Sequence, residues 1–535
     1  MSRGGGGIGR RLRAATHAKH PSIVHCRACR CGGRGAGSRR ERSGLSAGCP
    51  HVVVVGGGAT GLAAAFYLQH PDAAASGRAD GLRVTVLEAA AHPGGSVQTL
   101  ERRGCVIEAG PDSLLLRGEA LRSLVRATDL AGRIVAPRSL STYVYRSGKL
   151  HRFPAGTVLG VPARVLPFLR TRLVSPAGKL RALWDFLRRD VQMTGDEAVG
   201  TFLRRRLGDA VVDGLVAPLL EEIHNGDIDR MSLLATSPFF LKVRGAHRSL
   251  LFGARATLAA RLGAGGADED ATRRAGPVSF AAGMQSLIEG IVAQLPSGTV
   301  HTHAAVQAIT RCGDQYQVTV AGGAAIHADA VILAVPAPGA RAILGLAEDF
   351  GPLGQASPRH TTLVTLGLRT DEIDPWLPGT GVLVPPTSGC TLSACSWSHL
   401  KWPHVAPPGQ ALLRCYVRDT DEGPTLRPPD DVIAERARQD LERILGIRVN
   451  PEFHVVTHCA RGISSYAVGH LADVRQARSL VAARYPRVVL AGASYAGVAI
   501  PDCVEQGRTA ARQAIAELES PGLAARHAAA GACVA

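Results

Sequence analysis

The sequence predicts an α/β fold with three parts: a domain built on a parallel sheet and assembled from both chain ends, a mixed α+β domain, and a helical domain. Three observations predict it. A β-branched run, His51–Val55, leads into a glycine-rich turn and a helix. A late strand, Arg487–Gly492, also leads into a glycine loop and a helix, and residues 140–260 are rich in Arg, Leu and Pro. The 535 residues, 46% of them hydrophobic, suit a globular chain of about two to four domains.

The charge of the chain is concentrated at its N-terminus. Residues 1–50 hold eleven Lys or Arg and one acid, Glu41, so they carry +10 of the net +17. This segment has no periodic apolar pattern, and we expect a disordered basic tail. The basic total is a property of this tail, which argues against a nucleic-acid partner. Cys26-x-x-Cys29 lacks a second ligand pair at suitable spacing, so we predict no metal site.

The glycine-rich turn has the spacing that binds dinucleotides. Gly56-Gly57-Gly58-Ala59-Thr60-Gly61 directly follows the first strand and precedes the apolar helix Leu62–Leu68. Gly56 permits a tight turn, Gly58 allows a pyrophosphate to approach the backbone, and Gly61 allows the helix to pack closely. The N-terminus of that helix favours phosphate.

The second strand, Leu82–Leu87, ends at Glu88, whose carboxylate can accept both ribose hydroxyls of an adenosine and would repel a 2′-phosphate. Two further features favour FAD over NAD. Gly94-Gly95 follows closely, as is common in FAD-binding chains, and lets the backbone cross the pyrophosphate again. The last helix, about Val504–Leu518, is expected to direct its positive end toward the flavin pyrimidine. We therefore predict a Rossmann-like FAD-binding domain.

The middle of the chain alternates between segment types. Val278–Leu295 predicts a helix after Gly283, and Val300–Ile309, Tyr316–Val320 and Ala330–Pro336 predict strands that return to the nucleotide-binding domain. We assign the domains as follows: 1–50 disordered tail; 51–115, 276–340 and 481–520 FAD-binding domain; 116–275 substrate and helical domain; 341–480 second part of the substrate domain; 521–535 flexible C-terminus.

A series of blocks, in order along the chain, carries a resemblance to a known family. They include HVVVVGGGATGLAAAFYL, GGSVQT, GPDS, FPAGTVLGVPA, GDIDRMSLLATSP, WSHLKWPHVAPPG, YAVGH and GASYAGVAIPDCVEQGRTAA. From His51 to about Leu518 the chain resembles the protoporphyrinogen oxidase-like FAD flavoenzymes of heme biosynthesis. Within that family it is most similar to the bacterial, Gram-positive-type coproporphyrinogen III oxidases.

The resemblance implies oxidation of coproporphyrinogen III to coproporphyrin III by dioxygen, with release of hydrogen peroxide and non-covalent FAD. The flavin carries the redox chemistry, so no catalytic side chain is assigned. Oxidation of protoporphyrinogen IX is the nearest alternative. A second alternative is a related flavin amine oxidase or carotenoid desaturase, although no aromatic pair to cage an amine is evident. A third is a catalytically degenerate homologue that binds flavin or porphyrin without turnover.

The resemblance also implies the site residues. Those implied for FAD are Gly56, Gly57, Gly58, Ala59, Thr60, Gly61, Leu87, Glu88, Gly95, Gly110, Pro111, Asp112, Ser113, Val306, Cys459, Val498, Ala499 and Ile500. The substrate's propionates are anions, and Lys or Arg side chains are expected to bind them. The candidate substrate-binding residues are Lys149, Arg152, Arg248 and Lys401, together with Tyr466 near the pocket.

The chain departs from the family pattern at several positions. Cys459 stands where relatives keep a tryptophan against the flavin, and Glu222 replaces a glycine before the GDID block. Ala499 replaces the last glycine of GVGIP, and Gly118 a lysine sometimes found beyond GPDS. His92 and Ser96 replace the basic residues that flank the double glycine. These departures bear on activity and substrate affinity, whereas the phosphates of FAD are held by backbone.

The remaining expectations concern location and partners. The eight cysteines beyond residue 50 are scattered singly, which suits reduced thiols in a cytoplasmic protein. The sequence has no uninterrupted run of about 18 apolar residues, and we therefore predict no transmembrane segment. We expect a monomer or homodimer, and peripheral membrane contact stays open because the product is apolar.

Overall fold

The computed structural model describes residues 49–70, 81–139, 141–187, 195–224, 226–263, 276–346, 350–355, 361–418, 427–459 and 466–519. They belong to one unit, Cys49–Ala535. The predicted tail, apart from Cys49 and Pro50, and the predicted flexible C-terminus lie outside the described residues.

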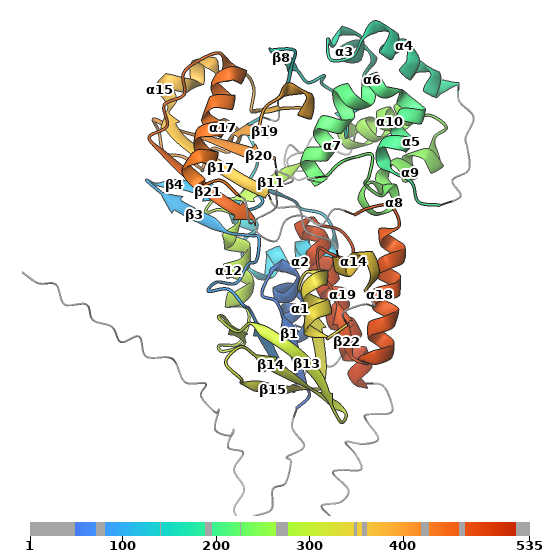
Figure 1. Cartoon of the computed structure of the whole chain (residues 1–535), viewed down its shortest axis with the longest axis vertical. Helices are drawn as coiled ribbons and strands as arrows, with labels where there is room; N and C mark the ends of the chain where they lie inside the picture. Colours follow the sequence, from blue (N-terminus) through green and yellow to red (C-terminus); the bar gives the residue numbers. More distant parts are fainter. Residues whose placement is uncertain are drawn as a thin grey trace, which may run out of the picture. The chain divides into compact units, whose positions relative to one another are not determined.

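A five-stranded parallel sheet joins the two ends of the chain (Figure 1). Its strand order is β12-β2-β1-β16-β22. The strands are β1 (His51–Val55), β2 (Arg83–Leu87), β12 (Val300–His301), β16 (Ala330–Leu333) and β22 (Val488–Leu490). β1 is buried on both faces, which explains why it is an unbroken run of β-branched residues. The predicted α/β fold class, with its sheet assembled from both chain ends, is confirmed.

Alternate residues of β1 serve two different cores. Val52 and Val54 pack in a core with α1 (Ala59–Gln69), α2 (Glu119–Ala127), α12 (Gln285–Ala293) and α19 (Ile500–Glu519). Val53 and Val55 pack on the other face. That face is covered by the antiparallel β13 (Val306–Cys312), β14 (Gln315–Val320) and β15 (Ala325–Ala328), and by α13 (Ala337–Ile343), α14 (Gly351–Gln355) and α18 (His470–Arg484).

A second, seven-stranded sheet forms the mixed α+β part. Its order is β21-β17-β20-β19-β18-β7-β8, antiparallel except where β18 runs parallel to β7. Its strands are β7 (Thr142–Arg146), β8 (Lys149–Arg152), β17 (Thr361–Arg369), β18 (Gly381–Leu383), β19 (Leu392–Trp397), β20 (Gln410–Val417) and β21 (Phe453–Cys459). One face packs on α17 (Asp430–Leu445), and α15 (Thr370–Ile373) and α16 (Ser398–Lys401) follow strand ends.

The helical part has its own apolar core. It comprises α3 (Val165–Arg170), α4 (Pro176–Leu183), α5 (Val199–Leu207), α6 (Asp209–Val211), a π-helical turn (Val212–Val216), α7 (Ala217–His224), α8 (Leu233–Thr236), α9 (Pro238–Ala246) and α10 (Leu250–Gly263), grouped together in Figure 1. A buried ion pair, Arg206 Nε to Asp185 Oδ1 at 2.7 Å, ties α5 to the turn after α4. Ser249 Oγ also donates to Asp185, so the buried carboxylate is well satisfied.

Short strands complete the fold between these parts. β3 (Thr99–Arg102) and β4 (Cys105–Glu108) form a hairpin. β11 (Pro277–Phe280) pairs with β5 (Leu114–Leu115) and β6 (Ile134–Val135), and β9 (Thr157–Val158) pairs with β10 (Val161–Pro162). Within the described ranges, none of the helices has the length and apolarity needed to cross a bilayer.

Candidate functional site

The turn after β1 is shaped by its glycines. Gly56 has φ +103°, a conformation that strains other residues, and a Cβ there would lie 2.6 Å from Ala334 O. A Cβ on Gly61 would lie 1.8 Å from Gly56 O, so only glycine lets α1 pack against the turn. At Gly58, by contrast, a Cβ would meet nothing nearer than the Cα of Gly95, at 4.0 Å. Open space therefore lies at the N-terminus of α1, which has no side-chain cap.

Glu88 is anchored beside this turn. Its carboxylate is buried and accepts hydrogen bonds from Gly57 N at 2.7 Å and Ala90 N at 2.8 Å. Two backbone donors fix the side chain at the end of β2 and leave further lone pairs for a ligand's hydroxyl groups. This arrangement suits the ribose of an adenosine.

The segment opposite Glu88 differs from the sequence prediction. Val300–Ile309 is not one strand but two, β12 and β13, separated at residues 302–305. His303 N donates to Ala90 O and Ala304 N to Glu88 O, and these bonds divert the backbone toward the Glu88 segment. Val306 is the first residue of β13 and is half-buried.

The double glycine completes a backbone cradle. Gly94 N donates to Gly57 O at 2.8 Å, which holds the Gly94–Gly95 loop beside the first turn. A Cβ on Gly94 would lie 2.5 Å from Val97 O, and Gly94 has φ +124°. Gly58 and Gly95 thus face each other where side chains would close the space. The residues present fit the pyrophosphate of a dinucleotide, which this cradle and the N-terminus of α1 would hold.

The last helix approaches the same region. α19 begins at Ile500, earlier than the predicted start near Val504, so Val498 and Ala499 immediately precede its first turn. A Cβ on Gly507 would lie 2.5 Å from Thr60 O, because α19 packs directly on α1. Tyr466 shapes the loop before α19: its hydroxyl donates to Ala493 O at 2.6 Å and accepts from Gly497 N at 2.9 Å.

The loop after β4 contacts both the double-glycine segment and α16. A Cβ on Gly110 would lie 1.7 Å from Ser96 O, which shows how closely the loop passes the double-glycine segment. Asp112 forms an ion pair with Lys401 Nζ at 2.8 Å and accepts from Trp402 Nε1 at 3.1 Å. Burial alone would raise the pKa of Asp112, but Lys401 and Arg414 outweigh it and hold the pKa well below its usual range.

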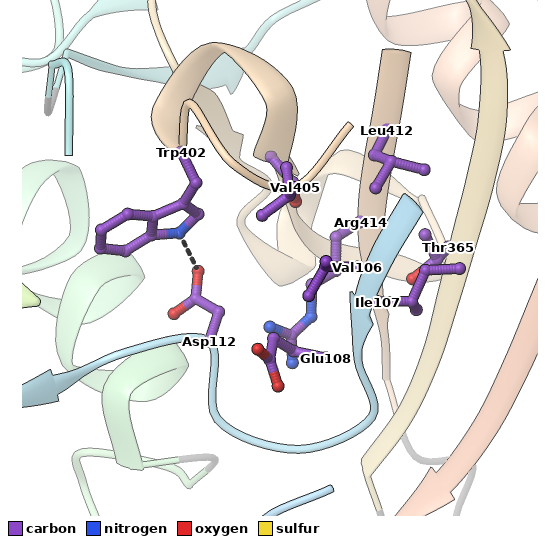
Figure 2. A pocket seen from close by; sticks show the side chains of 10 residues that line it. Val106, Ile107, Glu108, Asp112, Thr365, Trp402, Val405, Leu412 and Arg414 are labelled. Atoms are coloured by element: carbon purple, nitrogen blue, oxygen red, sulfur yellow. Dashed lines mark hydrogen bonds between the residues drawn. The ribbon is translucent and has the colours of Figure 1, made fainter. Parts of the chain in front are cut away.

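A small pocket lies behind this loop (Figure 2). It is lined by Val106, Ile107, Glu108, Asp112, Thr365, Ser398, Trp402, Val405, Leu412 and Arg414. Arg414 is buried and donates to Gly110 O, while no residue in the described part of the chain accepts a hydrogen bond from its Nε or Nη1. Its guanidinium lies beside the Glu108 carboxylate in Figure 2. Burial raises the pKa of Glu108 to about 7, against the opposing effect of hydrogen bonds from Met284 N and Thr99 Oγ1.

The other predicted site residues lie on separate elements. Lys149 and Arg152 are exposed on the edge strand β8, and Arg248 is exposed after α9. Lys401 is engaged by Asp112, and so its ammonium is not free. Cys459 ends β21, where its Sγ donates to Ala109 O at 3.3 Å. Gly118 is the N-cap of α2 with φ +79°, a conformation that explains a glycine there.

Three residues that sequence reasoning missed lie in this region: Glu108, Arg414 and Tyr416. Arg414 and Tyr416 are polar residues within the apolar strand β20, and Glu108 ends β4 just before Gly110. A charged side chain inside an otherwise apolar strand was the available signal. Among the described residues, no group of three or more His, Cys, Asp or Glu is placed to hold a metal ion.

The fold and the cradle define a dinucleotide-binding oxidoreductase of the FAD-dependent type. Residues 59–515 match the family model described as flavin containing amine oxidoreductase. Coproporphyrinogen III oxidase of Bacillus subtilis is 35% identical over 479 residues, covering 89% of this chain and all of the relative. The Staphylococcus aureus coproporphyrinogen III oxidase is 31% identical, covering 87% of this chain and 99% of the relative. The chain belongs to the flavin-containing amine oxidoreductase family, and its cofactor is FAD.

Solved structures agree with this assignment. A crystal structure from Exiguobacterium sp. 255-15, whose description assigns it to protoporphyrinogen oxidase, has a TM-score of 0.77 and 31% identity, covering 88% of this chain and 99% of that one. Reduced UDP-galactopyranose mutase has a TM-score of 0.64 at 14% identity, covering 88% and 98%. The similarity to the mutase concerns the fold alone.

Proposed function

We propose that this protein oxidises coproporphyrinogen III to coproporphyrin III in heme biosynthesis, with dioxygen as electron acceptor and hydrogen peroxide as by-product. The observation that carries the proposal is the match to coproporphyrinogen III oxidases along nearly the whole chain, with the FAD cradle intact. Bound FAD supplies a hydride acceptor and the means to pass electrons to dioxygen. The chain's own residues bind the two ligands, orient them and exclude water.

FAD recognition is divided among the segments described above. We propose that Gly56–Gly61 and Gly95 hold the pyrophosphate, Glu88 the ribose, and Val306 the adenine through its backbone. Residues 110–113 and 498–500, together with Cys459, would border the flavin. The support is their convergence: Gly58 faces Gly95, Gly110 contacts Ser96, and Cys459 contacts Ala109.

Propionate recognition is assigned to basic residues. Lys149, Arg152, Arg248 and Lys401 are the candidates, with Tyr466 near the substrate. Lys401 lies beside the loop that borders the flavin, but its pairing with Asp112 means that a propionate would have to displace that carboxylate. Tyr466 acts through the loop before α19, because both of its hydrogen bonds go to that loop.

Porphyrin fluorescence tests the function directly. Purified protein is given coproporphyrinogen III or protoporphyrinogen IX in air, and the rates are compared together with oxygen uptake. Faster turnover of the four-propionate substrate supports the proposal. A preference for protoporphyrinogen IX favours the second candidate, which the 28% identity to chloroplastic protoporphyrinogen oxidase 1 of Arabidopsis thaliana also brings into view. No fluorescence, and no flavin bleaching under anaerobic conditions, indicates a degenerate homologue.

We also propose a cytoplasmic monomer or homodimer with peripheral membrane contact through one surface, the apolar–basic surface of residues 164–187. Eight of its apolar side chains are exposed, among them Trp184 at 62% and Leu187 at 77%; the others are Val165, Leu166, Leu169, Leu180, Leu183 and Phe186. The same segment carries the cations Arg164, Arg170, Arg172, Lys179 and Arg181, and its one acid, Asp185, is buried against Arg206. Such a surface suits an anionic bilayer.

Vesicle sedimentation tests this contact. Wild-type protein should co-sediment with phosphatidylglycerol vesicles more than with phosphatidylcholine vesicles, and the double change Trp184→Ser/Leu187→Ser should reduce binding. Trp376→Ser is the matched control, since Trp376 is 59% exposed but lies outside the surface. Equal binding by all three proteins would contradict the assignment.

A further inference from the structure

Residues 466–470 connect the helical part to the loop that precedes α19. Their main chain is bonded to the helical part: Ser232 N donates to Tyr466 O at 2.8 Å, and Met231 forms an antiparallel bridge with Ala467. Met231 is buried in the apolar core of the helical part, and Ser232 caps α8. The backbone of segment 466–470 is therefore held by the helical part.

Asp196 of the helical part reinforces this attachment. Its half-buried carboxylate accepts hydrogen bonds through Oδ2 from Gly469 N at 2.9 Å and from Ser232 Oγ at 2.6 Å. Its Oδ1 accepts from Leu234 N at 3.2 Å. Because hydrogen bonds to a charged acceptor are among the stronger ones, this carboxylate fixes segment 466–470 against the start of α8.

The side chains of the segment hold the loop between β22 and α19. The Tyr466 hydroxyl donates to Ala493 O at 2.6 Å and accepts from Gly497 N at 2.9 Å, so it joins the two ends of the loop. His470 Nε2 donates to Tyr495 O at 3.1 Å, and its ring stacks on the Tyr466 ring with 3.9 Å between the centroids. Burial raises the pKa of Tyr466, so its hydroxyl keeps the proton that it donates. Two buried rings thus fix three peptide groups of one loop.

This loop lies beside the dinucleotide cradle. A Cβ on Gly492, its first residue, would lie 4.0 Å from Oγ1 of Thr60 in the first turn of α1. Gly497, with φ +94°, turns the chain into α19, and a Cβ there would lie 2.6 Å from the Cβ of Asp502. Residues 498–500 follow directly, so the position of Gly497 sets the position of the N-terminus of α19.

We propose that Tyr466 is a positioning residue for FAD, and that segment 466–470 couples the helical part to the end of the flavin site formed by residues 498–500. The inference rests on the proposed placement of FAD against those residues and does not depend on the identity of the substrate. The field of a helix N-terminus falls off within the first turn, so a small displacement of the loop changes the interaction of α19 with the flavin. Contacts made by Asp196 within the helical part therefore affect the binding of FAD.

Tyr466→Phe tests the positioning role, because it removes both hydroxyl bonds and keeps the ring stack. The holoenzyme is diluted, and the fluorescence of released FAD gives the dissociation constant. We expect this constant to rise by about tenfold, and the visible absorption bands of the bound flavin to shift. Tyr485→Phe is the matched control, because the Tyr485 hydroxyl also donates to a backbone carbonyl, Leu344 O at 2.6 Å, but one outside the loop. This control should bind FAD as wild type does.

Asp196→Ala tests the coupling. It removes the acceptor of Gly469 N and should raise the FAD dissociation constant by about threefold. Combined with Tyr466→Phe it should add little, giving about tenfold in total, whereas independent sites would give the product, about thirtyfold. Glu197→Ala is the control in the helical part, since the Glu197 side chain pairs with Arg205 there, at 2.6 Å from Oε1 to Nη2. It should leave FAD binding unchanged.

Two results would overturn the inference. One is wild-type FAD affinity with an unchanged flavin spectrum in Tyr466→Phe, and the other is a double variant whose effect equals the product of the single effects. If a thermal scan shows that Tyr466→Phe does not fold, His470→Phe takes its place, because it keeps a ring against Tyr466 but loses the bond to Tyr495 O.

These measurements do not require turnover, so they are separate from the test of the proposed function. A wild-type protein that binds FAD but oxidises neither porphyrinogen would contradict the proposed function and leave this inference intact. Porphyrinogen oxidation by wild type, with FAD binding unaffected in every variant, would do the reverse.

Discussion

At the scale of single residues, burial decides which charges are available at the site. Lys401 of α16 and Asp112 of the loop after β4 neutralise each other, and Asp112 also accepts from Trp402. Among the described residues, none accepts a hydrogen bond from the Nε or Nη1 atom of Arg414, and Glu108 beside it has a pKa raised to about 7 by burial. The polar groups behind the Gly110–Ser113 loop are therefore only partly compensated, which makes their protonation relevant to stability.

We predict that Glu108 makes the protein less stable as the pH rises. Its pKa is about 7 in the folded chain and 4.5 ordinarily, so between these values the folded protein holds a proton that the unfolded chain has released. The free energy of unfolding therefore falls through this window, by about 3 kcal/mol in total. Denaturant unfolding at pH 5 and pH 8 should show a smaller decrease for Glu108→Gln.

The control for this prediction is Glu119→Gln. Glu119 lies on α2 with its side chain 61% exposed, so its replacement should leave the wild-type pH dependence unchanged. If Glu108→Gln keeps the same decrease as Glu119→Gln, the buried carboxylate is not the cause.

At the scale of elements, the strand–turn–helix unit of β1 and α1 combines two kinds of glycine. Gly61 is required by packing, since its Cβ position is occupied by Gly56 O. Packing does not require a glycine at position 58, because a Cβ there would lie no nearer than 4.0 Å to any other atom of the protein. We propose that the space at Gly58 is kept for the pyrophosphate, whereas glycine at position 61 allows the helix to pack against the turn.

This difference predicts opposite effects of the same substitution. Gly61→Ala should lower the free energy of unfolding by more than about 2 kcal/mol, because backbone must move. Gly58→Ala should leave the stability of the apoprotein unchanged or slightly higher, since φ −75° suits alanine. It should nonetheless weaken FAD binding by at least about tenfold. Thermal unfolding of apoprotein and FAD titration measure the two effects, and tight FAD binding by Gly58→Ala would refute the assignment.

At the scale of the whole molecule, hydrogen bonds join the first residues of β1, and Pro50 before it, to neighbouring segments of the sheet. Arg83 N donates to Pro50 O at 2.9 Å, and His51 N donates to Asp329 Oδ2 at 2.8 Å. These bonds join the beginning of β1 to β2 and to the residue before β16. The residues that the sheet needs for its stability therefore begin near residue 49.

We predict that deleting residues 1–48 leaves FAD content, thermal unfolding and turnover unchanged. Deleting residues 1–52 should reduce FAD content and stability, because it removes the Pro50 and His51 bonds and shortens β1. Flavin absorbance per protein and a thermal scan of the three proteins provide the measurement. Loss of FAD in the shorter deletion would show that the tail contributes to the site.

The strand–turn–helix segment that we propose holds FAD was predictable because it is local. His51–Val55, the glycines from Gly56 to Gly61, and Glu88 act through backbone sterics and burial patterns that span a few neighbouring residues. Val300–Ile309 was predicted as one strand and is two, because its middle bonds to Glu88 and Ala90, more than two hundred residues earlier. The start of α19 was placed late because its first turn has the composition of a loop.

The amino-acid sequence by itself determined the α/β class, the cofactor and the family, since each rests on residue order along short segments. Only the tertiary structure decided which polar groups meet. It paired Lys401 with Asp112, turned Tyr466 toward the loop before α19, and placed Arg414 over the Tyr416 ring. The physical reason is that charge pairing and burial depend on contacts between segments that are distant in the sequence, which no local pattern encodes.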